Sequence, residues 1–132
     1  MYNEVNLIFG AILKRLLLLI FLLTISLFAE STIKSDKMIL LYVEMDYCPW
    51  CQRMDKEVFE NSKNFDYLQK LYTIKRVKKG DTPSFIKAKY YPTTFILSSD
   101  GKEIVDELPG YMKAEDYLDY LNTLVEVENS TD

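Results

Sequence analysis

The sequence has no histidine and only two cysteines, and this scarcity excludes several kinds of site. Without histidine there is no Ser-His-Asp triad and no Cys-His nucleophile pair. Two cysteines alone are also too few for a closed zinc site of the usual Cys/His kind. The net charge of −4 argues against a nucleic-acid-binding surface. The local basic cluster of Lys75, Arg76, Lys78 and Lys79 is interpreted as a solvated strand edge, where lysines deter edge pairing.

A long apolar run lies near the N-terminus. Residues 16–29 (LLLLIFLLTISLFA) follow the basic pair Lys14-Arg15, an order that is typical of a secretory signal peptide. An uncleaved anchor is the alternative, because residues 7–13 are also apolar and the combined stretch approaches the roughly 20 residues that span a bilayer. Under either interpretation the rest of the chain lies outside the cytoplasm. We therefore expect residues 1–29 to be a signal peptide or membrane anchor. The protein would then be periplasmic or extracytoplasmic, soluble after cleavage or anchored by residues 16–29.

The remaining residues, 30–132, have the length of one small domain that folds on its own. Its cysteines, Cys48 and Cys51, would meet an oxidising compartment, where a pair serves either as a structural disulfide or as a redox couple. A structural disulfide stabilises by closing a loop, and the gain grows with loop length. A bridge within Cys-x-x-Cys restricts little chain, so the spacing favours a redox couple.

Local patterns predict the order of the elements in this domain. The Pro49 ring suits the first position of a helix, and so does Pro83 after the capping Thr82. Asp100-Gly101 is a hairpin turn signal. The patterns predict strands at about 37–45, 72–77, 93–98 and 102–108, and helices at about 49–60, 65–72, 82–89 and 113–127. A parallel strand pair with an added hairpin gives a mixed sheet with helices on its faces, an α/β sandwich.

The domain resembles the thioredoxin superfamily over nearly its whole length. The likeness rests on the strand ILLYVEM, the motif CPWC at a helix start, the segment YYPTTFIL, the turn SSDGK, and ELPGY before the last helix. The whole is most similar to bacterial periplasmic thioredoxin-like proteins, the group that includes sulfur-oxidation thioredoxins and Dsb-type enzymes. The resemblance implies a thioredoxin-like three-layer α/β sandwich with a mixed central sheet.

The resemblance also implies roles for individual residues. Cys48 would be the attacking thiol and Cys51 the resolving thiol, with Pro92 as a cis-proline that faces them. Trp50 points off the start of the helix and would therefore contact the substrate, while Tyr91 would either contact the substrate or pack against the fold. Unpaired amides and the helix dipole at a helix start stabilise a thiolate there. Cys48 would form a mixed disulfide with the substrate, and Cys51 would release it.

The activity that we expect is thiol–disulfide exchange on protein disulfides, as a reductase. No cofactor other than the Cys48–Cys51 disulfide and no metal are expected. The expected partners are protein substrates and a membrane-bound redox protein, without nucleic acid, and the protein would be a monomer. Pro49 and Trp50 replace the Gly-Pro of reducing thioredoxins, so the direction of electron flow stays open. Many thioredoxins also carry a buried acid where this sequence has Tyr42.

Two alternatives belong to other functional classes. A Cu(I) carrier could use both thiolates with Met45 and Met54 as thioether ligands, which suit a soft metal. Against this, Met54 falls where the helix needs a core residue, and Met45 is equally well interpreted as strand interior. A non-catalytic interaction module on the same fold would keep its function after Cys48→Ser.

Overall fold

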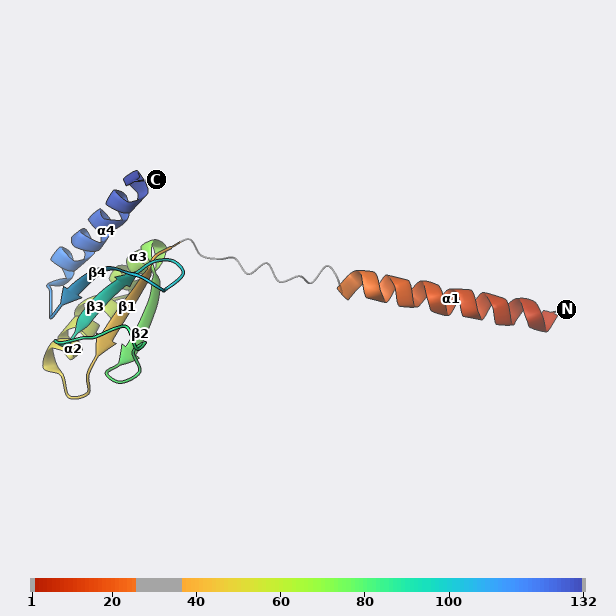
Figure 1. Ribbon diagram of the computed structural model, residues 1–132, viewed down its shortest axis with the longest axis horizontal. Coiled ribbons are helices and arrows are strands. Elements are labelled where there is room, and N and C mark those ends of the chain that lie inside the picture. Colours follow the sequence, from red (N-terminus) through yellow and green to blue (C-terminus); the bar gives the residue numbers. More distant parts are fainter. Residues whose placement is uncertain (1, 26–36, 132) are drawn as a thin grey trace. The chain divides into compact units, whose positions relative to one another are not determined.

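The computed structural model describes residues 2–25 and 37–131 (Figure 1). The chain divides into two units, residues 1–34 and 35–132. The first contains helix α1 (Tyr2–Ile25). In the described ranges, no helix has the length and apolarity that crossing a membrane requires. The signal peptide or anchor at 1–29 stays a prediction, and its last residues, 26–29, lie outside the described residues.

The second unit contains all of the strands that the structure describes. Its elements are β1 (Ile39–Glu44), α2 (Pro49–Met54), the π-helical turn η1 (Asp55–Phe59), α3 (Ser62–Leu71), β2 (Thr73–Lys78), β3 (Thr93–Leu97), β4 (Ile104–Pro109) and α4 (Ala114–Thr131). The strand order is β2-β1-β3-β4. The β1–β2 pair is parallel, while β3 runs antiparallel to both β1 and β4. This confirms the predicted mixed sheet of an α/β fold.

The β3–β4 hairpin closes at the predicted Asp100-Gly101 signal. The amide of Gly101 donates to the Ser98 carbonyl at 2.8 Å, and Gly101 adopts a positive φ of 74°. A residue without a Cβ adopts this conformation at little cost, so glycine suits the turn. At the other end of the unit, α4 runs to Thr131 and is longer than the predicted 113–127.

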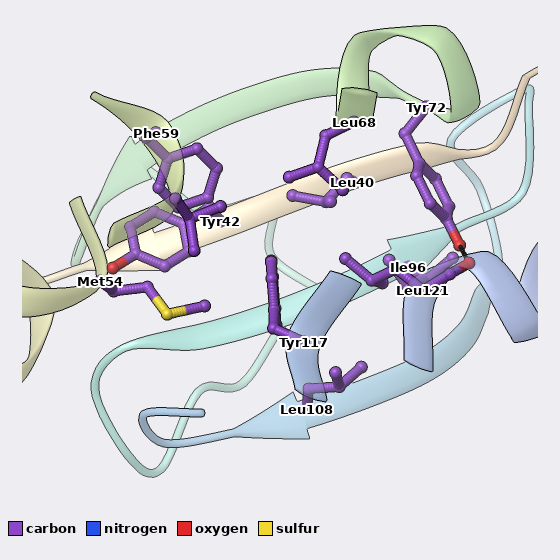
Figure 2. Close-up of a cluster of buried hydrophobic side chains, with 11 residues drawn as sticks. Leu40, Tyr42, Met54, Phe59, Leu68, Tyr72, Ile96, Leu108, Tyr117 and Leu121 are labelled. Carbon is purple, nitrogen blue, oxygen red and sulfur yellow. Dashed lines mark hydrogen bonds between the residues drawn. The ribbon is translucent and has the colours of Figure 1, made fainter. Parts of the chain in front are cut away.

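Alternating side chains of β1 point to opposite faces of the sheet and pack in two separate cores. Leu40 and Tyr42 belong to the larger core, which the helices cover (Figure 2). In Figure 2 the Tyr72 hydroxyl donates to the Leu121 carbonyl; this bond of 2.7 Å ties the C-terminal end of α3 to α4. The buried members of this larger core are Leu40, Tyr42, Met54, Val58, Phe59, Leu68, Tyr72, Ile96, Leu108, Tyr117 and Leu121.

Within the described residues of the second unit, an irregular segment covers the opposite face of the sheet, so the helix predicted at 82–89 is wrong. Residues 83–86 form a single turn in which the Ile86 amide donates to the Pro83 carbonyl at 2.9 Å. Ile86 is buried against Leu41 and Phe95 in the smaller core. A helix this short forms too few hydrogen bonds to offset the free-energy cost of its nucleation. Burial of Ile86 stabilises the turn instead. The third layer is therefore this irregular segment.

The helix predicted at 49–60 is present, but its second half is π-helical. The amide of Asp55 donates to the carbonyls of both Cys51 and Gln52, and the Glu60 amide donates to the Asp55 carbonyl at 2.7 Å. Such wider turns within α-helices occur frequently at functional sites. Here the change from α to π falls at Asp55, one turn after Cys51.

Candidate active site

The two cysteines lie where β1 leads into α2. Cys48 is the N-cap of α2, and Pro49 holds the first helical position as predicted. Cys48 and Cys51 form a disulfide with a Cα–Cα distance of 5.2 Å. Both are buried, and the Cys51 amide donates to the Cys48 sulfur at 3.1 Å. An amide in this position stabilises negative charge on the sulfur of Cys48 when the pair is reduced.

The segment around Pro92 lies next to Cys48. The Tyr91–Pro92 peptide bond is cis, as the resemblance implied. The Tyr91 carbonyl oxygen is 3.7 Å from the Cys48 sulfur. The Gly110 amide donates to the Pro92 carbonyl at 2.7 Å, which fixes the β4–α4 turn beside the same segment. The structure thus brings together Cys48, Tyr91 and Pro92, three of the predicted site residues.

A hollow with aromatic walls opens beside Trp50, and we call it the aromatic hollow. It is lined by Trp50, Tyr90, Tyr91, Pro109, Gly110 and Tyr111. The Trp50 side chain is 53% exposed and thus lies outside the core, as predicted. Its ring centroid is 5.3 Å from that of Tyr111. The prediction of site residues missed Tyr111, although the ELPGY motif pointed to this turn.

A polar cluster supports the Trp50 and Tyr111 rings. Arg53 pairs with Glu57 at 2.8 Å, and the Tyr111 hydroxyl donates to the other Glu57 oxygen at 2.6 Å. The Arg53 guanidinium carbon lies 4.8 Å from the Tyr111 ring centroid and 6.0 Å from that of Trp50. The hydrogen bonds from Arg53 and Tyr111 hold the pKa of Glu57 below its ordinary value. Glu57 thus stays ionised and keeps Tyr111 against the helix that carries Trp50.

A second hollow contains both cysteines, and we call it the charged hollow. Glu44, Asp46, Asp55 and Lys78 line it together with Cys51. The hollow lies where β1 and β2 end and the helix begins, so charges from three elements meet there.

The two carboxylates of this hollow share one arginine. Arg76 hydrogen-bonds to Glu44 at 2.8 Å and also pairs with Asp55, while Lys78 pairs with the second Glu44 oxygen at 2.8 Å. Burial by itself would raise the pKa of Glu44, but the hydrogen bonds from Lys78 and Arg76 outweigh burial and lower it. For Asp55, burial is the largest effect and raises the pKa, and Arg76 offsets this only in part. The structure therefore gives the two acids pKa shifts of opposite direction.

Tyr42, at the position of the missing acid, belongs to the larger core. Its hydroxyl lies 3.5 Å from the Cys51 carbonyl, and its ring centroid is 4.5 Å from that of Phe59. Burial, followed by the charges of Asp55 and Glu44, raises the pKa of Tyr42. The hydroxyl therefore keeps its proton at physiological pH.

The methionines of the copper alternative lie in different surroundings. Met54 is 1% exposed and packs in the larger core, whereas Met45 is 38% exposed. This agrees with the interpretation of Met54 as a core residue. Among the described residues, no group of three or more histidine, cysteine, aspartate or glutamate side chains could hold a metal ion.

Comparisons with known proteins agree with this fold. A family model described as a thioredoxin-like domain matches residues 28–124. A search of curated proteins found no match.

Solved structures with a similar fold come from several bacteria. A thioredoxin-fold protein from Helicobacter pylori is 20% identical with a TM-score of 0.57, and the match covers 69% of this chain and 70% of that one. The periplasmic thioredoxin SoxS from Paracoccus pantotrophus is 20% identical with a TM-score of 0.56, over 68% of this chain and 97% of that one. A disulphide isomerase from Xylella fastidiosa Temecula1 is 18% identical with a TM-score of 0.54, over 69% and 80%. Because the identities are this low, these structural matches show a shared fold alone.

Proposed function

Because this chain belongs to the thioredoxin-like domain family, we propose that it is a protein-disulfide reductase that cycles the Cys48–Cys51 pair. The fold and the disulfide together support a thiol–disulfide oxidoreductase in general. The position of the Cys48 sulfur is the main support for this proposal. The sulfur caps α2, accepts a hydrogen bond from the Cys51 amide and lies 3.7 Å from the Tyr91 carbonyl oxygen, beside the aromatic hollow. The substrate cysteine would approach Cys48 from this side.

The reaction is an exchange of disulfides in two steps. The Cys48 thiolate attacks one sulfur of a substrate disulfide, and the other substrate sulfur leaves as a thiolate. Cys51 then attacks the Cys48 sulfur, the mixed disulfide breaks, and the substrate leaves reduced. The protein ends with its Cys48–Cys51 disulfide, and two electrons have passed to the substrate. A membrane-bound dithiol partner would restore the reduced state, without any other cofactor.

The substrate is proposed to bind as an extended segment. The backbone of Tyr91 would pair with it, since an extended peptide can add main-chain hydrogen bonds to such a segment. The exposed Trp50 ring would contact the side chains that flank the substrate cysteine.

The site of action is proposed to be the periplasm or another extracytoplasmic compartment. The apolar residues 16–29 after Lys14-Arg15 support export. One structure with this fold is described as a periplasmic thioredoxin. The protein would act there as a monomer.

Trapping of substrates tests the proposal. In a Cys51→Ser variant the mixed disulfide cannot be resolved, so substrate proteins should accumulate on Cys48 and be released by dithiothreitol. The Cys48→Ser variant is the matched control, because it keeps one thiol but lacks the attacking one. Equal trapping by both variants, or none by either, would contradict the assigned roles. An interaction module would instead retain its partners in the Cys48→Ser variant.

A further inference from the structure

The resolving step needs a proton acceptor. Cys51 attacks as a thiolate, and its thiol must first lose a proton. The residue is 3% exposed, so bulk water has little access to its sulfur. The chain contains no histidine, and the Tyr42 hydroxyl under Cys51 keeps its own proton. Carboxylates line the same hollow as Cys51, and an ionised carboxylate is a base that can accept this proton.

Asp55 is the acid that the helix directs to the same hollow as Cys51. It follows Cys51 by one helical turn, and its amide donates to the Cys51 carbonyl. Both residues line the charged hollow. The Asp55 side chain is 21% exposed, so it can exchange a proton with solvent after receiving one from the interior.

We propose that Asp55 accepts the proton of the Cys51 thiol in the resolving step, across the hollow that both side chains line. This assignment rests on the function proposed above. The Cys51 S–H bond breaks and its proton passes to the Asp55 carboxylate. The Cys51 thiolate then bonds to the Cys48 sulfur, and the substrate leaves as a thiolate. Asp55 finally returns the proton to solvent or to the departing thiolate.

The surrounding charges favour Asp55 over Glu44 in this role. The facing groups are Glu44 on β1, Arg76 and Lys78 on β2, and Glu60 after the π-helical turn. Lys78 and Arg76 both hydrogen-bond to Glu44 and keep it ionised. Among the described residues, Asp55 pairs with Arg76 alone, and burial, followed by the charges of Glu44 and Glu60, raises its pKa. Groups whose environments move their pKa values apart are suited to different acid–base roles.

A two-phase thiol reaction tests this assignment on the full chain. Reduced protein is mixed with 5,5′-dithiobis(2-nitrobenzoate) in a stopped-flow instrument, and released thionitrobenzoate is followed by absorbance. The first phase depends on reagent concentration and reports attack by Cys48. The second phase is unimolecular and reports resolution by Cys51. Each is measured from acidic to alkaline pH.

Asp55→Asn should slow the second phase by about 100-fold at neutral pH, the lower end of what general base catalysis supplies. In the unsubstituted protein this phase should slow as pH falls and Asp55 becomes protonated. The variant should lack that titration and show a rate that simply rises with hydroxide. Its first phase should stay within about twofold of the unsubstituted rate, which also verifies folding. Asp66→Asn, the same change on α3 away from the charged hollow, should alter neither phase.

Two results would overturn the assignment. In one, Asp55→Asn resolves at the unsubstituted rate with the unsubstituted pH profile. In the other, Glu44→Gln removes the titration and Asp55→Asn does not. A third result concerns the proposed function itself. If the unsubstituted protein shows the first phase but no second phase, both the proposed function and this inference are contradicted.

Discussion

The aromatic hollow and the charged hollow serve the same pair of cysteines, yet they are built from different kinds of residue. Rings, Pro109 and Gly110 line the first. Carboxylates and Lys78 line the second, together with Cys48 and Cys51 themselves. Only Trp50 of the Cys-x-x-Cys motif reaches the aromatic hollow. The difference indicates a division of work, in which one side contacts the substrate and the other handles charge and protons.

This division explains why both hollows depend on the same short helix. Trp50 and Arg53 point to the aromatic side, where Arg53 packs on Tyr111. Cys51 and Asp55 lie one turn apart and line the charged side. Residues one turn apart on a helix share a face, so one helix can present two different faces to two sites. Substitutions on each face should therefore affect different steps of the exchange.

The largest effect on the aromatic side is expected from Trp50→Ala. Loss of the exposed ring should lower kcat/KM for a protein disulfide by about tenfold, equivalent to about 1.4 kcal/mol. The unimolecular resolving phase with the small aromatic disulfide should not change, because it takes place on the charged side. Insulin reduction and stopped-flow kinetics measure the two quantities. An equal loss in both would break the proposed division.

Arg76→Gln should perturb the charged side and leave the aromatic hollow unchanged. Arg76 lowers the pKa of both Glu44 and Asp55, so its removal should raise both. Asp55 would then be ionised only at higher pH, and the acidic limb of the resolving rate should move to higher pH. At pH 6 we expect a rate reduced by roughly threefold. A limb that moves to lower pH would contradict this electrostatic account, and Lys75→Gln on the same strand serves as control.

A smaller effect is expected from Tyr111→Phe. This change removes the hydroxyl that donates to Glu57 and keeps the ring beside Trp50. We expect kcat/KM for insulin to fall by about twofold, since orientation is weakened while the contact surface remains. A loss as large as that of Trp50→Ala would mean that the Glu57 hydrogen bond, rather than the rings, controls substrate binding.

The smallest effect is expected from Tyr42→Phe, despite its place beneath Cys51. The hydroxyl makes a long contact of 3.5 Å with the Cys51 carbonyl, so its loss should cost about 0.5 kcal/mol of stability in urea unfolding. The pH profile of the resolving phase should stay unchanged, because this hydroxyl does not titrate in the accessible range. A changed pH profile would indicate that Tyr42, rather than Asp55, accepts the proton.

Local signals predicted most of the sheet and the start of the active-site helix. Pro49 at the first helical position and Asp100-Gly101 in the hairpin act through backbone conformation, which neighbouring residues determine. The Thr82-Pro83 signal has the same form but fails, because burial of Ile86 against the sheet outweighs a short helix. Such competition between local preference and tertiary packing is not visible in sequence periodicity.

The motif made the cysteines predictable, but it did not reveal their electrostatic surroundings. Arg76 meets Glu44 across 32 positions of sequence and Asp55 across 21. Both contacts exist only because β1 and β2 pair in parallel, with Tyr42 opposite Arg76. The basic cluster that contains Arg76 lies exposed along the edge strand β2, as interpreted from the sequence, but Arg76 also pairs with two carboxylates there. The partners of Arg76 depend on the register between β1 and β2, which local sequence patterns do not reveal.

The reduction potential of the Cys48–Cys51 couple tests the central claim most directly. The protein is equilibrated in glutathione and dithiothreitol buffers, and the fraction oxidised is measured by thiol alkylation. The account predicts a single two-electron couple near the roughly −270 mV of thioredoxin, as a reductase requires. A value near about −120 to −180 mV would contradict the reductase assignment and indicate an oxidase or isomerase. If no intramolecular disulfide forms in any buffer, the redox function itself is contradicted.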